Sequence, residues 1–283
     1  MSEVEAKIRG RAKELLADGK VNCFIGWGAT RFPGKTTPKF VIKPEDADGL
    51  VYNENCLNLL AKYVLDSQFK DGVTGLCTRG CESRAINRLI ADGRLRREQV
   101  YLVGIPCGGM KENGNTAEKC EYCTNRNPVI YDELVGEKVA ECEIPGRFAA
   151  VDDIESMSSD ERYDFWKSQF EKCIRCYACR NACPACNCME CYADHYRTGF
   201  MGKQANGVEN QVFGMTRAFH AGERCIECGE CQSVCPMGLR LMSLNRKLVR
   251  EVGDLFGFTG HGMDADPARA LGSYEKEDLD EFM

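Results

Sequence analysis

The chain has 283 residues, which is enough for two domains that each bury a core of their own. Its formal net charge of −6 disfavours nucleic acid as the main partner. The 19 cysteines, against 3 histidines, exceed ordinary usage but fall below the density of a small disulfide scaffold. The first residues, MSEVEAKIRGRAKELL, lack the apolar run of a secretory signal, so we expect a cytoplasmic protein whose clustered cysteines bind metal. No apolar stretch is long enough to predict a membrane span.

The N-terminal half shows alternating helix and strand signals. An amphipathic helix is expected over 1–19, because Ile8, Leu15 and Leu16 share one face. The elements expected next are a strand at 21–27, a Gly/Pro-rich turn at 28–38, extended pieces at 40–42 and 50–52, a helix at 55–67, a strand at 72–76, a helix at 82–91 and a strand at 99–105. This strand–helix–strand order predicts an α/β domain with a mainly parallel sheet over 1–150.

An acidic, irregular interval at 129–159 separates the two halves, and we interpret it as a connector. Helices are predicted at 160–171 and 239–256, on either side of a cysteine-rich region at 173–236. The predicted second domain therefore spans 151–256. An acidic tail follows at 257–283.

The strongest chemical signal is a cysteine motif that occurs twice in the second domain. Both copies read C-x2-C-x2-C-x3-C-P, one running from Cys173 to Pro184 and the other from Cys225 to Pro236. This is the bacterial ferredoxin pattern, in which three thiolates bind one 4Fe-4S cluster and the fourth crosses to the other cluster. The predicted ligands are Cys173, Cys176, Cys179 and Cys235 for cluster 1, and Cys225, Cys228, Cys231 and Cys183 for cluster 2. The motif predicts an α+β bacterial-type 2×4Fe-4S ferredoxin domain, and a pair of zinc ribbons is the alternative.

An insertion between the two motifs carries three further cysteines, Cys186, Cys188 and Cys191. Three thiolates do not complete a 4Fe-4S site, so a further cluster requires a ligand from elsewhere. The candidate fourth ligands are Cys56, Cys142, Cys23 and Cys77. A cysteine-rich loop that packs beside the clusters is the open alternative.

A second group of cysteines follows the predicted strands of the first domain. Ligands bind beyond the carboxyl ends of parallel strands, and those ends are neighbours if the strands at 72–76 and 99–105 are adjacent. The predicted ligands of a third cluster are Cys81, Cys107, Cys120 and Cys123, with Cys77 in reserve. Gly80, Gly108 and Gly109 suit a backbone that passes close to a cluster. Buried apolar thiols with a zinc-like C-x2-C pair are the alternative, and loss of this site is expected to leave the ferredoxin pair intact.

With these residues in view, the chain resembles the beta-subunit family of the deazaflavin (coenzyme F420) hydrogenases and formate dehydrogenases, specifically its soluble dicluster-ferredoxin members. The resemblance rests on FIGWG (24–28), NENCLNLLAKYVL (53–65), RGCESRAINRLI (79–90), REQVYLVGIPCGGM (97–110), CIRCYACRNACPACNCMEC (173–191) and ERCIECGECQSVCPMGLRL (223–241). It implies a subunit that passes electrons among hydrogenase, dehydrogenase or heterodisulfide-reductase-like modules. It also implies a flavin, FAD or FMN, although the paired-glycine loop that flavin-binding relatives have ahead of their first helix has no counterpart here.

The leading functional prediction is a non-catalytic relay of single electrons between other subunits of a redox complex. At least two 4Fe-4S clusters are expected, the N-terminal cysteines predict a third, and the insertion leaves a fourth open. The alternative is a flavin-containing oxidoreductase subunit that exchanges a hydride with deazaflavin or NAD(P)H. A cluster-based redox sensor needs a DNA-binding or output module, and no basic patch or helix-turn-helix pattern indicates one.

Overall fold

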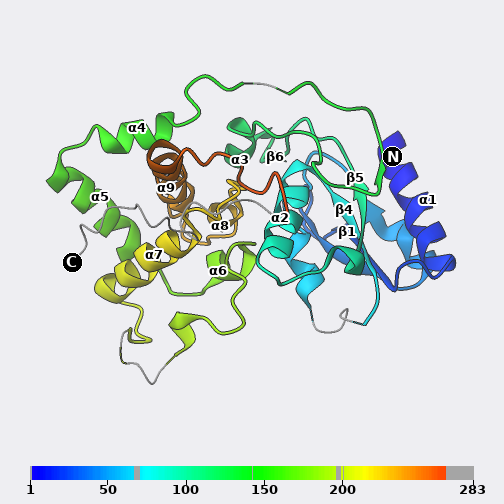
Figure 1. The fold of residues 1–283 in the computed structure, drawn as a ribbon, viewed down its shortest axis with the longest axis horizontal. Coiled ribbons are helices and arrows are strands. Elements are labelled where there is room, and N and C mark those ends of the chain that lie inside the picture. Colours follow the sequence, from blue (N-terminus) through cyan, green and yellow to red (C-terminus); the bar gives the residue numbers. More distant parts are fainter. Residues whose placement is uncertain (1, 67–70, 142, 196–198, 200, 266–283) are drawn as a thin grey trace, which may run out of the picture.

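A computed structural model describes residues 2–66, 71–141, 143–195, 199 and 201–265. Its N-terminal half is built on one sheet with the strand order β2-β1-β4-β5-β8, and β3 also pairs with β1 (Figure 1). The strands are β1 (Cys23–Ala29), β2 (Thr36–Val41), β3 (Leu50–Val51), β4 (Thr74–Thr78), β5 (Val100–Gly104) and β8 (Glu133–Leu134). The pairs β1–β4, β4–β5 and β5–β8 are parallel, whereas β2 and β3 run antiparallel to β1. The predicted α/β domain with a mainly parallel sheet is confirmed.

The central strands and two long helices form the core of this half. β1 is buried along six of its seven residues and β4 along its whole length, as expected for parallel strands covered on both faces. Helix α1 (Glu3–Ala17) begins at Ser2, whose side chain accepts a hydrogen bond from the Glu5 amide, and it buries Ile8 and Leu15 against the sheet. Helix α2 (Gly80–Ala91) follows β4 directly.

The helix predicted at 55–67 is wrong over 55–66, the part of that range that the structure describes, because a short 3₁₀ helix, η2 (Ala61–Leu65), is the only helix there. Distant partners take up the backbone groups that an α-helix would need. The carbonyl of Asn58 accepts hydrogen bonds from Trp27 and Arg79, and the Leu59 amide donates to a carboxylate of the second half. Tertiary hydrogen bonding thus overrides the apolar periodicity of this segment.

The interval predicted as an irregular connector contains β8, the last strand of the sheet. It is only two residues long, and its position is fixed by Asp132, whose carboxylate accepts hydrogen bonds from the Leu102 amide and from Arg97. Between β5 and β8 the chain also forms a small hairpin of β6 (Lys111–Glu112) and β7 (Asn115–Thr116), followed by α3 (Glu118–Glu121).

The second half consists of helices and the loops that carry cysteines. The helices are α4 (Ala149–Glu155), α5 (Ser159–Glu171), α6 (Ala178–Ala182), α7 (Gly207–Ala221), α8 (Glu230–Ser233) and α9 (Leu241–Phe256). Helix α7 packs against both α5 and α9 (Figure 1). Among the described residues after β8 no strand is assigned, so the predicted α+β character of this domain is wrong there. Its backbone instead forms helices and the loops that carry the cysteines.

The two halves pack against each other directly. Ile226, from the second half, is a buried member of the core that surrounds the N-terminal sheet. Asn87 of α2 donates hydrogen bonds to the carbonyls of Gly262 and Met263, and Lys62 of η2 donates to the carbonyls of Arg180 and Cys186. Within the described ranges, no helix combines the length and apolar character that crossing a membrane requires.

Candidate metal centres

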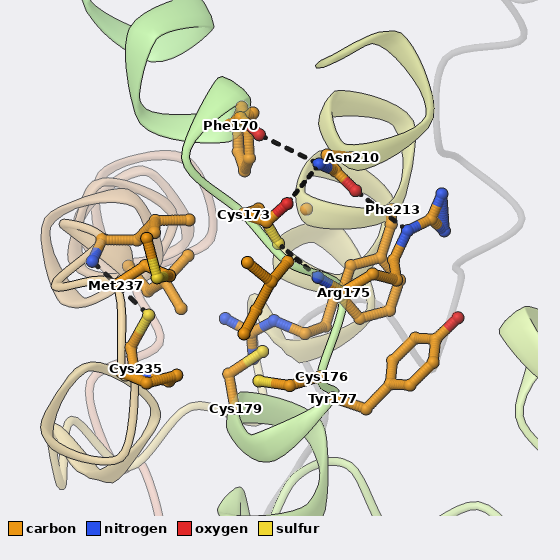
Figure 2. Close-up of a pocket in the computed structure, with 16 residues that line it drawn as sticks. Phe170, Cys173, Arg175, Cys176, Tyr177, Cys179, Asn210, Phe213, Cys235 and Met237 are labelled. Atoms are coloured by element: carbon orange, nitrogen blue, oxygen red, sulfur yellow. Dashed lines mark hydrogen bonds between the residues drawn. The ribbon is translucent and has the colours of Figure 1, made fainter. Parts of the chain in front are cut away.

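The four cysteines predicted for cluster 1 line a single cavity. Cys173, Cys176 and Cys179 come from the loop before α6 and its first turn, and Cys235 comes from the segment between α8 and α9 (Figure 2). Two of the thiols accept hydrogen bonds from backbone amides, Arg175 N to Cys173 Sγ at 3.4 Å and Leu239 N to Cys235 Sγ at 3.5 Å. The structure thus places the crossing cysteine of the second motif beside the three cysteines of the first.

The cysteines predicted for cluster 2 line a second cavity with the reciprocal arrangement. Cys225, Cys228 and Cys231 lie on the loop before and within α8, and Cys183 reaches the same space from the end of α6. The side-chain nitrogen Nδ2 of Asn245, on α9, lies 3.5 Å from Cys231 Sγ. Burial raises the pKa of Cys231 to about 12, so a thiolate here needs a compensating positive partner such as iron.

The two cysteine loops share one unusual backbone shape. The residue before the second cysteine and the residue after it both have positive φ in each loop, +55° and +60° at Arg175 and Tyr177, and +55° and +67° at Glu227 and Gly229. Three of these four residues are not glycine, so this backbone conformation costs conformational free energy. Such strained backbone is typical of functional sites. Backbones of this kind turn N–H groups inward to form the anion-binding nests found at iron–sulfur sites. The loops therefore fit a thiolate-ligated 4Fe-4S cluster.

The N-terminal cysteines also converge on one cavity, lined by Cys81, Cys107, Cys120 and Cys123. The strands that precede Cys81 and Cys107, β4 and β5, are adjacent and parallel as expected, so their carboxyl ends meet at one edge of the sheet. Backbone amides again point at sulfur: Gly109 N lies 3.4 Å from Cys107 Sγ, and Met110 N lies 3.3 Å from Cys120 Sγ.

The predicted roles of the three glycines at this site differ. Gly109 has a φ of +108°, which favours glycine. At Gly80 an added Cβ would lie 2.1 Å from the Asn125 carbonyl oxygen, so glycine is needed there for close backbone packing. Gly108 has open space around it and no positive φ, so neither reason applies to it.

Buried positive charge surrounds the N-terminal cysteine cavity. Arg79 and Lys119 line it, and both are almost fully buried. Burial raises the pKa of Cys81, while the charges of these two cations oppose the shift. Arg79 also stacks on the Trp27 ring at 4.5 Å and pairs with Glu82 at 2.6 Å. Two cations beside four thiols suit an anionic group.

The N-terminal cavity and the cluster 2 cavity adjoin, because Glu227 and Cys228 line both of them. The premise of the expected independence, that the two sites lie apart in separate domains, is therefore wrong. Cys228, a predicted ligand of cluster 2, lies in the wall between the two sites.

Comparisons with known proteins agree with this geometry. A family model described as a 4Fe-4S dicluster domain matches residues 169–239, which include both cysteine motifs. The F420-dependent formate dehydrogenase subunit beta of Methanocaldococcus jannaschii is 33% identical over 94 residues, which are 33% of this chain and 24% of that protein. The F420-dependent formate dehydrogenase 1 subunit beta of Methanococcus maripaludis is 47% identical over 45 residues, 14% of this chain and 12% of that protein. Over these matched residues the chain is similar to the beta subunits of F420-dependent formate dehydrogenases.

This relationship covers a limited part of each protein. The chain spans about a quarter of the first relative's length and less of the second's. Residues 169–239 form an iron–sulfur domain of the 4Fe-4S dicluster kind. The ligand sets, the number of clusters and the flavin stay predictions.

The three insertion cysteines lie together, but the structure does not bring Cys56 to them. Cys186, Cys188 and Cys191 line an open cavity of about 700 Å³. Cys56 is buried in the N-terminal core, where its thiol lies near the Val51 carbonyl and accepts from the Asn53 amide. The Cys56 thiol is thus held by backbone groups of its own turn and does not extend toward the insertion.

The remaining candidate ligands lie elsewhere. Cys23 of β1 and Cys77 of β4 are buried in the sheet core, so the structure does not place Cys77 as a reserve ligand of the N-terminal site. Cys142 falls outside the described residues. Cys186 shares a hydrogen bond with Cys183, which lowers the pKa of Cys183 and raises that of Cys186, so the insertion touches the cluster 2 cavity.

No group of three or more His, Cys, Asp or Glu side chains in the described part of the chain is arranged to hold a single metal ion. The cysteines are instead spaced around cavities, and a four-iron cluster is larger than one ion. The sequence analysis missed the charged residues of these sites, Arg79, Lys119 and Arg217. Sequence spacing carries no signal for them, because they reach the cysteines through tertiary packing.

Proposed function

We propose that the chain is an iron–sulfur electron-transfer subunit of a cytoplasmic oxidoreductase complex in an anaerobic cell, and that it relays single electrons between partner redox sites. The observation that carries this proposal is the row of three cysteine cavities. The N-terminal cavity shares Cys228 with the cluster 2 cavity, and the buried Arg217 faces cysteines of cluster 2 and cluster 1. Three adjoining sites of this kind suit a relay better than separate structural roles.

The proposed ligands are those predicted from the motifs. Cluster 1 is assigned Cys173, Cys176, Cys179 and Cys235; cluster 2 is assigned Cys225, Cys228, Cys231 and Cys183; and cluster 3 is assigned Cys81, Cys107, Cys120 and Cys123. Each set lines one cavity, which supports the assignment. The three insertion cysteines lack a fourth thiol among the lining residues of their cavity, so we assign them no cluster.

The surface beside cluster 1 is a suitable exit for electrons. Cys176 is exposed, and the neighbouring Ile174, which also lines the cluster 1 cavity, is 54% exposed. A partner subunit that covers this apolar side chain would bring its own redox centre close to the cluster. The names of the relatives support a dehydrogenase as the partner, and hydrogenase or heterodisulfide-reductase-like partners share the same requirement for single electrons.

A second candidate function is hydride exchange between deazaflavin or NAD(P)H and a flavin bound by this chain. The open cavity of about 700 Å³ is roomy enough to favour it, and Lys62, Arg94 and Arg224 supply positive charge at its wall. A bound FAD or FMN would appear in the supernatant of the denatured protein.

A reductive titration of the reconstituted full-length chain tests the proposal. Dithionite, added anaerobically, should deliver at least about two electrons per chain and bleach the brown absorbance of the clusters. NADH should leave the absorbance unchanged. Turnover of NADH with a dye acceptor by the pure protein, together with released flavin, would overturn the relay in favour of the second candidate.

A further inference from the structure

Arg217 is a buried arginine that has no carboxylate partner in the described part of the chain. It lies on α7, is 2% exposed, and forms no ion pair among the described residues. Its Nε and Nη1 atoms have no hydrogen-bond partner within the described structure. The remaining nitrogen, Nη2, lies 3.5 Å from Asn245 Oδ1, which is a weak contact.

Three other buried arginines are paired with carboxylates, whereas Arg84, which is 5% exposed and lines the N-terminal cysteine cavity, forms no ion pair among the described residues. Arg79 binds Glu82, Arg88 binds Asp92, and Arg246 binds Glu227, with nitrogen–oxygen distances of 2.6 to 2.9 Å. Buried charges in proteins are ordinarily paired or bound to metal sites. No carboxylate of the described residues pairs with Arg217, so a different negative group is needed to compensate its charge.

The groups around Arg217 are thiols from both predicted ferredoxin clusters. The Asn245 side chain lies 3.5 Å from Arg217 Nη2 through its oxygen and 3.5 Å from Cys231 Sγ through its nitrogen. Burial alone would lower the pKa of Arg217, but the sulfurs of Cys231, Cys183, Cys179 and Cys186 act together to raise it. Cys179 is a predicted ligand of cluster 1, whereas Cys183 and Cys231 are predicted ligands of cluster 2. Arg217 lines the cluster 1 cavity as well. The guanidinium thus lies between the two sites.

A 4Fe-4S cluster held by four thiolates carries net negative charge, and it gains one more negative charge when it accepts an electron. A fixed cation nearby interacts more favourably with the reduced form than with the oxidised form, so it raises the reduction potential. The effect is strong where water is excluded.

We infer that Arg217 is a shared positioning residue of the two ferredoxin-type sites, acting as the counter-ion that raises the reduction potential of both clusters. This inference rests on the proposed function. It assigns to one side chain a property that the cysteine motifs do not specify.

The test compares redox titrations of the reconstituted full-length protein, monitored by electron paramagnetic resonance. We compare Arg217→Gln and Arg217→Met at the wild-type iron content. At a fixed ambient potential, each should show at least a tenfold lower ratio of reduced to oxidised cluster. A tenfold change in this ratio corresponds to a shift of about 59 mV in the reduction potential of a one-electron couple. Arg217→Lys keeps the charge and should stay within tenfold of the wild-type ratio. Arg250→Gln is the matched charge control, because Arg250 pairs with Asp152 near the surface, and it should shift the ratio far less.

Uncharged variants that load fully but shift the ratio no more than Arg250→Gln would overturn the inference. If the uncharged variants do not bind iron, Arg217→Lys tests the inference instead. A tenfold or larger fall in its ratio of reduced to oxidised cluster would show that the positive charge does not determine the reduction potential. Failure of the wild-type chain to bind clusters at all would instead contradict the proposed function.

Discussion

The buried pair of Lys119 and Glu230 joins the N-terminal cysteine site to the ferredoxin-like half, and breaking it should destabilise both. Lys119 Nζ lies 2.7 Å from Glu230 Oε2, and the two side chains are 8% and 4% exposed. The same lysine donates to the Leu57 carbonyl at 2.6 Å, and Glu230 accepts from the Leu59 amide at 3.1 Å. Glu230→Gln preserves shape and an acceptor for Leu59 but leaves the ammonium group without its carboxylate partner.

Removing one member of a buried ion pair costs about 3–5 kcal/mol. Since Gln keeps one hydrogen bond, we take the lower value of about 3 kcal/mol. For a protein of this size that corresponds to a fall of about 6–12 °C in the thermal midpoint. Circular dichroism at one fixed scan rate, on anaerobic protein with equal iron content, measures it.

Glu118→Gln is the matched control. Glu118 is an exposed carboxylate whose nearest cation, Arg240, lies 3.8 Å away, so its loss should cost about 1 kcal/mol or less. The double variant Lys119→Met with Glu230→Gln should be more stable than the sum of its single changes implies, because it removes the uncompensated charge. A midpoint for Glu230→Gln equal to that of the Glu118→Gln control would refute the reasoning.

Three further predictions follow from the sites. Cys107→Ser should remove about four irons per chain and, because Cys228 borders both cavities, should also alter the resonance signal of cluster 2; unchanged iron would contradict the third site. Burial raises the pKa of Asp92, but hydrogen bonds from Arg224 and Asn187 and the charges of Arg224 and Arg88 together outweigh burial and lower it overall. The stabilisation by Asp92 is therefore complete above about pH 4 and is lost as the pH falls through the lowered pKa. The thermal midpoints of wild type and Asp92→Asn should therefore differ near neutral pH and converge in acid. A difference between the two midpoints that does not change with pH would contradict this prediction. Cys186→Ser should leave the iron content unchanged, whereas a loss of about four irons would reveal a further cluster.

The cysteine sites could be predicted from the sequence because their information is local. Two-residue spacing sets which thiols share a loop, and the position of Cys81 and Cys107 after two adjacent strands sets which edge they occupy. The prediction of Cys56 as a fourth ligand was wrong because its position depends on contacts with distant residues. Its segment has helical periodicity, but hydrogen bonds to Trp27 and Arg79 hold it in the core.

The charged groups of the sites could not be predicted, because they depend on contacts between distant parts of the chain. Lys119 and Glu230 are separated by 111 residues, and no local pattern marks them as partners. Arg217 lies on α7, which the sequence analysis did not identify among the cysteine-rich segments. Electrostatic control of a site emerges only after helices and loops pack together.

Metal analysis of the anaerobically reconstituted full-length chain tests the central claim most directly. We predict at least about eight irons and a matching amount of inorganic sulfide per chain from the two ferredoxin-type sites, rising to about twelve when the N-terminal site is filled. Zinc in place of iron, or iron without sulfide, would contradict it.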